Sequence, residues 1–266
     1  MSDAPIGVFD SGVGGLTVLA ALTARLPRED FIYLGDTARL PYGTKSPETV
    51  ARYSQQATQA LTKYGVKCIV IACNTASSVG LPAIKTQVPV VGVIEPGAQA
   101  ACTASRTGNI AVIATEGTVR GGAYQQAILR IRPAARVYAE PATLFVALAE
   151  EGLNEGPIAN DIASHYLKPL FEKAVPDTLV LGCTHFPMLA GAIRHAVGPS
   201  VQIVDSAETT AASVDALLQN EGLAGTKRGG GSVRLLATDG RERFARVGSR
   251  FLKRAISPQE VELVDL

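Results

Sequence analysis

Short runs of consecutive apolar residues recur along the chain, separated by longer segments in which apolar residues follow a helical spacing. Continuous apolar runs are typical of parallel strands that are covered by helices on both faces. The pattern predicts nine strands, at residues 6–9, 31–34, 68–72, 90–94, 110–114, 136–139, 178–182, 201–204 and 233–237. Repeated strand–helix units predict an α/β protein, and right-handed crossovers then give doubly wound, mainly parallel sheets.

The clearest helix signal lies between the second and third predicted strands. Ser46 is suited to cap a helix, Pro47 suits the first helical position, and Gly65 follows the last turn. We therefore expect a helix from Ser46 to about Tyr64. Residues 222–232 (GLAGTKRGGGS) are instead predicted to form a flexible, glycine-rich surface loop.

Two of the predicted strands end in a cysteine that is followed by polar residues. The segments 69–75 (IVIACNT) and 179–185 (LVLGCTH) share this pattern. Residues 109–117 resemble the first strand and turn of a new α/β lobe. We therefore expect two similar lobes related by a pseudo-twofold axis, with an active site in the cleft between them. Residues 1–97 together with 206–266 are predicted to form lobe 1, and residues 98–205 lobe 2.

Composition and charge narrow the classes of function. The 266 residues carry a formal net charge of +1 at pH 7, which favours neither a nucleic-acid partner nor an acidic membrane. No segment approaches the roughly 20 apolar residues of a membrane span, and residues 1–5 lack a signal-peptide pattern, so we expect a cytoplasmic location. Basic residues cluster near the carboxyl end, where we interpret them as the solvated face of an amphipathic helix; they are Arg241, Arg243, Arg246, Arg250, Lys253 and Arg254.

Four cysteines are expected to stay reduced in such a compartment, and with only three histidines the chain offers little support for a metal site. Cys68 and Cys102 fit the role of small buried apolar residues. The matched settings of Cys73 and Cys183 favour reactive thiols, because a helix N-terminus lowers the pKa of a thiol. Ligands also bind at the carboxyl ends of parallel strands, so two such thiols predict a site that moves a proton through a stereocentre.

Other polar segments leave several interpretations open. The loop Asp10–Gly15 (DSGVGG) suits an anion, either a carboxylate or the phosphate of an actin-like ATPase, but it lacks the spacing of a dinucleotide fingerprint and the lysine of a P-loop. Asp10 could pair with an ammonium, assist a base or cap the next helix. His185 is a structural residue or a proton partner of the nearby thiol.

Taken together, these segments resemble the signature segments of bacterial glutamate racemases, within the wider aspartate/glutamate racemase superfamily. The resemblance rests on residues 10–15 (DSGVGG), 35–37 (GDT), 41–43 (PYG), 72–76 (ACNTA) and 182–187 (GCTHFP). It extends from residue 6 to about residue 215. It implies an isomerase that needs no cofactor or metal and supplies D-glutamate for peptidoglycan. Relatives of this kind are often homodimers.

The resemblance also implies roles for individual residues. Cys73 would deprotonate D-glutamate and Cys183 L-glutamate, with Asp10 near Cys73 and His185 near Cys183. A glutamate is expected beside Cys183, and Glu150 matches it better than Glu151. The residues expected to bind substrate are Asp10, Ser11, Tyr42, Gly43, Asn74, Thr75, Thr184 and His185.

The chain departs from the family pattern at a few positions. Ala142, Thr143 and Ala147 stand where relatives commonly have a cysteine and two prolines, just before Glu150. Gly121 replaces a frequent serine, whereas Thr115 and Thr118 match.

Three other functions compete with the racemase. A phosphotransferase or nucleotidase would use the Asp10–Gly15 loop but leave both cysteine segments unexplained. A noncatalytic amino-acid-binding protein would not need opposed thiols. A pyridoxal-phosphate racemase would need a lysine near a phosphate loop, and none stands out.

Overall fold

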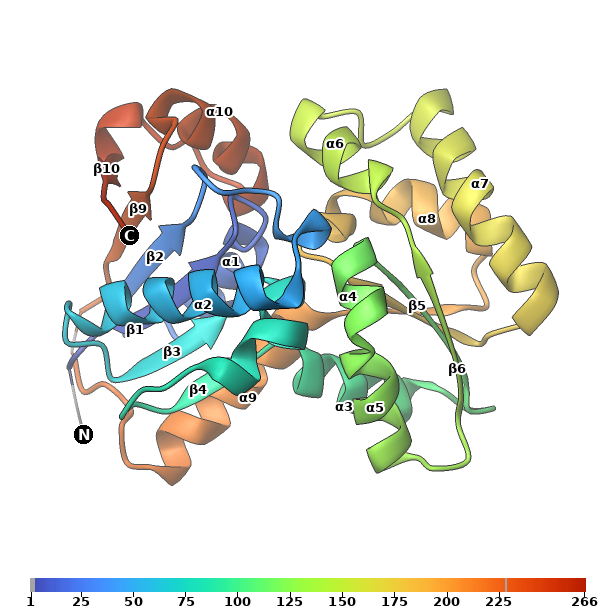
Figure 1. Cartoon of the computed structure of the whole chain (residues 1–266), viewed down its shortest axis with the longest axis horizontal. Helices are drawn as coiled ribbons and strands as arrows, with labels where there is room; N and C mark the ends of the chain where they lie inside the picture. The colour runs from blue at the N-terminus through green and yellow to red at the C-terminus, as the bar shows by residue number, and fades with distance from the viewer. Residues whose placement is uncertain (1–2, 228) are drawn as a thin grey trace.

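Two parallel sheets form the frame of the protein, whose computed structural model describes residues 3–227 and 229–266 (Figure 1). The first sheet has six strands in the order β10-β9-β2-β1-β3-β4, and the second has four in the order β6-β5-β7-β8. The strands are β1 (Ile6–Asp10), β2 (Phe31–Gly35), β3 (Cys68–Ile71), β4 (Val90–Gly92), β5 (Asn109–Ala114), β6 (Arg136–Pro141), β7 (Thr178–Gly182), β8 (Gln202–Asp205), β9 (Val233–Ala237) and β10 (Val261–Leu263).

The two sheets repeat one strand order. The run β2-β1-β3-β4 in the first sheet corresponds to β6-β5-β7-β8 in the second, and every pair is parallel. This repetition confirms the prediction of two similar, doubly wound lobes. In each sheet the chain first adds a strand on one side of β1 or β5 and then crosses to the other side, to β3 or β7. The loops that follow these strands therefore diverge, and such a switch point is where α/β sheets bind ligands.

Helices connect the strands and cover the sheets (Figure 1). They are α1 (Leu16–Arg25), α2 (Pro47–Thr62), α3 (Ile94–Ala104), α4 (Glu116–Gly121), α5 (Ala123–Ile131), α6 (Leu144–Glu151), α7 (Pro157–Ala174), α8 (Ala190–Val197), α9 (Ser206–Asn220) and α10 (Arg241–Leu252). Short 3-10 segments are η1 (Tyr42–Thr44), η3 (Leu81–Ala83), η4 (Phe186–Leu189) and η5 (Pro258–Glu260), and η2 (Ala76–Gly80) is a π-helical segment.

The predicted helix after Ser46 is confirmed as α2. The Ser46 hydroxyl accepts a hydrogen bond from the amide of Thr49 at 3.3 Å, which caps the helix. Beyond the end of the helix, Gly65 has φ +70, a left-handed conformation that glycine adopts without steric cost.

All nine predicted strands are present, with small differences at their ends. The fourth is shorter than the apolar run 90–94, because Ile94 already begins α3, and residues 95–97 form the first turn of that helix. Strand β10 was not predicted, since three residues are too few for a pattern. In the predicted loop 222–232, residue 228 lies outside the described residues, and residues 229–232 are exposed. No helix in the described part of the chain is both long and apolar enough to cross a bilayer.

The basic residues near the carboxyl end lie as predicted. Helix α10 is amphipathic, with Phe244, Val247 and Phe251 buried. Arg243 and Arg250 lie on its exposed side, and both also bond to Glu150 of the other lobe, which the sequence did not predict.

Candidate active site

A cavity of about 280 Å³ lies between the lobes, at the carboxyl ends of the strands. A cavity of this size is suited to a small molecule and not to a polymer. Residues of both lobes line it: Ser11, Gly12, Leu40, Pro41, Gly43 and Thr44 from the first, and Thr115, Thr143, Val146, Ala147, Glu150 and His185 from the second.

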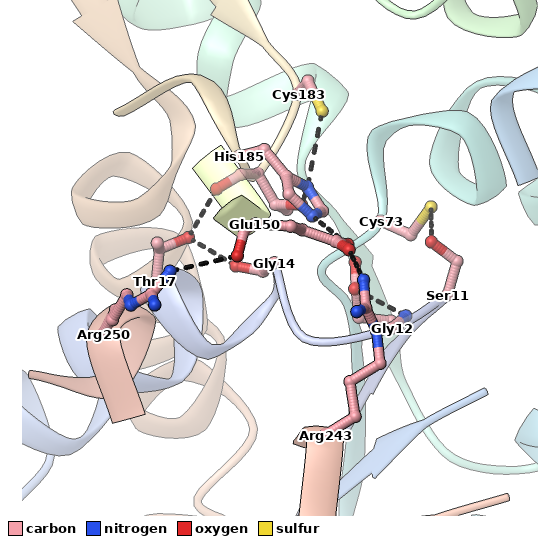
Figure 2. Close-up of polar contacts among 12 residues, drawn as sticks. Ser11, Gly12, Gly14, Thr17, Cys73, Glu150, Cys183, His185, Arg243 and Arg250 are labelled. Carbon is pink, nitrogen blue, oxygen red and sulfur yellow. Dashed lines mark hydrogen bonds and ion pairs between the residues drawn. The ribbon is translucent and has the colours of Figure 1, made fainter. Parts of the chain in front are cut away.

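Cys73 follows β3, and Figure 2 shows its thiol beside Ser11, which lines the first-lobe side of this cavity. The Cys73 thiol donates to the Ser11 hydroxyl at 3.6 Å and accepts the Ala76 amide at 3.4 Å. Burial, assisted by the Asp10 carboxylate, nevertheless raises the pKa of Cys73 to about 12. The expectation that a helix start lowers this pKa is wrong, because one amide hydrogen bond does not offset burial.

Cys183 follows β7 and belongs to a chain of polar groups, shown in Figure 2, that includes His185 and Glu150 of the cavity lining. Its sulfur lies 3.8 Å from Nδ1 of His185, and Nε2 of His185 lies 3.1 Å from Oε1 of Glu150. Burial disfavours the charged imidazole, but the bonds to Cys183 and Glu150 outweigh it and raise the pKa of His185 to about 10. Glu150 makes this contact, whereas Glu151 is exposed.

Asp10 ends β1 and is fully buried. Burial raises the pKa of its carboxyl group, while the charge of His185 and the amides of the following loop oppose that rise. One carboxyl oxygen, Oδ2, accepts the Gly12 amide at 2.9 Å. The other, Oδ1, is buried without a hydrogen-bond partner among the described residues. Asp10 therefore interacts electrostatically with Cys73, as expected, and also with His185.

Asn74 and Thr75 start the helical turn after Cys73, and both are buried. Oδ1 of Asn74 accepts the Tyr124 hydroxyl at 2.8 Å, whereas Nδ2 has no partner among the described residues. The Thr75 hydroxyl meets those of Thr115 and Thr118 at 2.9 and 3.1 Å, which links the two lobes.

Tyr42 and Gly43 are adjacent but differently placed. Gly43 lines the cavity. Tyr42 is buried behind it and donates its hydroxyl to Asp36, so the Tyr42 side chain is committed elsewhere.

The loop after β1 packs directly on the segment after β7. The Thr17 hydroxyl donates to the carbonyl of Gly14 at 2.9 Å and lies 3.3 Å from that of Thr184 (Figure 2). A Cβ atom at Gly14 would lie 2.5 Å from Nδ1 of His185 and closer still to the Thr184 hydroxyl. Glycine at this position therefore permits the close approach of the lobes.

The structure places two of the segments in which the chain departs from the family pattern. Thr143 and Ala147 line the cavity beside Glu150, and Glu150 still reaches His185. A Cβ atom at Gly121 would lie 2.5 Å from Oγ of Ser78, so residue 121 faces Ser78.

Sequence reasoning missed three residues of this region. Tyr124 holds Asn74, while Arg243 and Arg250 hold Glu150. A lone tyrosine and two arginines on an amphipathic helix carry no motif, so only the fold could identify them.

Comparisons with known proteins agree with this geometry. Residues 9–214 match the family model described as Asp/Glu/Hydantoin racemase. A curated glutamate racemase from Geobacter metallireducens is 50% identical over 249 residues, which cover 93% of this chain and 92% of the relative. The crystal structure of a glutamate racemase isoform from Bacillus anthracis superposes with a TM-score of 0.94 at 35% identity, covering 100% of this chain and 99% of that one. A glutamate racemase from Francisella tularensis, solved in complex with D-glutamate, gives a TM-score of 0.92 at 35% identity, with coverage of 100% and 98%. The chain therefore belongs to the Asp/Glu/hydantoin racemase family and is an amino-acid racemase, an isomerase.

Proposed function

We propose that the protein interconverts L-glutamate and D-glutamate by a two-base mechanism without a cofactor, using Cys73 and Cys183. The observation that carries this proposal is that each lobe holds one thiol in contact with a residue that lines the same cavity. Each thiol has its own polar partner there, Ser11 for Cys73 and His185 for Cys183. Two thiols on opposite sides of a substrate can exchange its α-proton without either base moving around the carbanion.

The reaction needs one protonated and one ionised thiol. Cys183 as thiolate takes the α-proton of L-glutamate, and the Cys73 thiol then donates its proton to the opposite face to give D-glutamate. The reverse reaction uses Cys73 as the base. The raised pKa of Cys73 supports its role as the proton donor of the resting enzyme. The imidazolium of His185, held by Glu150, supplies the positive charge that stabilises a thiolate at Cys183.

The substrate also has to be held, and its carbanion stabilised, by fixed polar groups. The unpartnered Nδ2 of Asn74 suits the α-carboxylate, and the unpartnered Oδ1 of Asp10 suits the ammonium. Ser11, Thr75 and Thr184 supply further hydroxyl donors in our proposal. Gly43 lines the cavity, and Tyr42, the other predicted binding residue, would contribute without its hydroxyl, which bonds to Asp36. A phosphate-loop function is not favoured, because the amides of the Asp10–Gly15 loop already bond to the Asp10 carboxylate.

The remaining expectations stay proposals that accompany this function. They are the supply of D-glutamate for peptidoglycan in the cytoplasm, a homodimer, and the division into residues 1–97 with 206–266 and residues 98–205.

The decisive assay incubates L-glutamate or D-glutamate with the protein in deuterated water without added cofactor. We expect optical rotation to decay to zero and solvent deuterium to appear at the α-carbon of the product. Cys73→Ala and Cys183→Ala should each reduce the rate by about a thousandfold, the size of effect of a lost acid–base group. Cys68→Ala and Cys102→Ala serve as matched controls. Full activity of either catalytic variant would disprove the two-thiol mechanism.

A further inference from the structure

Helix α10 belongs to the lobe of the first sheet, because it follows β9, but one of its sides faces the second lobe. Arg243, Val247, Arg250 and Phe251 have the spacing of residues that share one helix face. The Phe251 ring packs edge-on against the His185 ring, with centroids 5.1 Å apart. The helix thus reaches the group that stands beside Cys183.

Two arginines on this face bond to one residue of the other lobe, as Figure 2 shows. Nη2 of Arg243 lies 2.6 Å from Oε2 of Glu150, and Nη1 of Arg250 donates to the Glu150 carbonyl at 3.0 Å. Glu150 occupies the last turn of α6, where positive charges are favourable because of the helix dipole. These contacts therefore join the lobes at the residue whose carboxylate bonds to His185.

The two carboxylate oxygens of Glu150 have separate partners. Oε1 bonds to His185, and Oε2 bonds to Arg243. The terminal torsion of a glutamate has a broad, weak preference, so the plane of its carboxylate is set by hydrogen-bond partners. With Arg243 present, both oxygens are held, and the acceptor stays aligned with the imidazole.

We propose that Arg243 is a positioning residue, which holds Glu150 in the orientation that supports His185 and, through it, proton transfer by Cys183. This inference rests on the proposed racemase function. It makes one half of the reaction depend on the docking of α10 against the other lobe. A merely structural arginine would stabilise the contact between the lobes without affecting one thiol more than the other.

Isotope effects separate these two roles. The equilibrium constant between the enantiomers is one, so kcat/KM must be the same in both directions for every variant. The ratio of kcat/KM for L-glutamate to kcat/KM for D-glutamate therefore carries no information about which thiol is affected. The α-deuterium isotope effect does differ between directions. If transfer at Cys183 slows, the effect rises for the enantiomer that Cys183 deprotonates and falls for the other one.

The test compares Arg243→Met and Arg243→Lys with the wild type and with Arg246→Met, which removes an exposed arginine of the same helix. Arg243 is half exposed, so we expect Arg243→Met to lower kcat/KM by about fivefold, with isotope effects that diverge between the enantiomers. Arg243→Lys should recover part of the loss, and Arg246→Met should match the wild type. Thermal unfolding of each variant shows whether it is folded.

A double-substitution cycle tests whether Arg243 acts through Glu150. In a Glu150→Gln background, Arg243→Met should cost less than twofold. Fold losses that multiply, or isotope effects that stay equal to those of the wild type, would overturn the positioning role while leaving the racemase function intact. A wild-type protein that does not racemise glutamate would instead overturn the proposed function, and this inference with it.

Discussion

Replacing Tyr124 by phenylalanine removes one hydroxyl group from the interface between the lobes. Tyr124 lies in α5 of the second lobe, is buried, and donates to Oδ1 of Asn74 in the first lobe at 2.8 Å. Its ring fits between two glycines, since a Cβ atom at Gly97 or at Gly182 would lie 3.1 Å from it. Phenylalanine keeps this packing, so the substitution removes only the contacts of the hydroxyl, which are the bond to Asn74 and one with the Ser206 side chain.

The expected loss of stability follows from the acceptor that loses its hydrogen-bond donor when the hydroxyl is removed. A buried hydrogen bond contributes about 1 kcal/mol, and a buried acceptor left without its partner costs about 1–3 kcal/mol. We therefore expect Tyr124→Phe to lower the free energy of unfolding by about 2 kcal/mol and Tm by roughly 5 °C. The Asn74 amide, then free to turn, no longer presents Nδ2 to the substrate, and kcat/KM should fall about tenfold, mainly through a higher KM.

The assay measures racemisation by polarimetry at several concentrations of each enantiomer, together with thermal unfolding. Tyr138→Phe is the matched control, because Tyr138 is a half-buried tyrosine of the same lobe whose hydroxyl makes no hydrogen bond to the described residues. If Tyr124→Phe retains kcat/KM within twofold of the control and the same Tm, the hydroxyl does not orient Asn74, and the reasoning is refuted.

Two further predictions concern the contact near His185. Gly14→Ala places a methyl group against His185 and Thr184 and should lower kcat/KM about a hundredfold. The control is Gly191→Ala, whose methyl group would meet no atom within 4 Å and which should leave kcat/KM unchanged. If the two variants have equal kcat/KM values, the tight contact at Gly14 is contradicted. Because the pKa of His185 rises from 6.5 to about 10 on folding, its stabilising contribution is complete below pH 6.5 and lost as pH rises through 10. Urea unfolding should show the stability difference between wild type and His185→Gln shrinking from about pH 7 to pH 10; a constant difference would exclude a charged ring.

Predictability differed between elements for identifiable reasons. The buried strands β1, β3, β5 and β7 are continuous apolar runs, so their pattern alone marks them. The three-residue β10 has no such pattern and depends on pairing with β9. The π-helical and 3-10 turns after Cys73 and Cys183 were not foreseen either, because their hydrogen bonding depends on the surrounding packing.

Local sequence was sufficient to place Cys73 and Cys183 at strand ends, because each of these features lies in one short segment. The preference for Glu150 over Glu151 came from the resemblance to the racemase family. Only the tertiary structure decided which side chains from distant segments contact the residues of the site. Arg243 reaches Glu150 from 93 positions away, and Tyr124 reaches Asn74 from 50. The pKa of Cys73 was likewise decided by burial, which exists only once the lobes have packed and outweighs the helix start that the sequence makes visible.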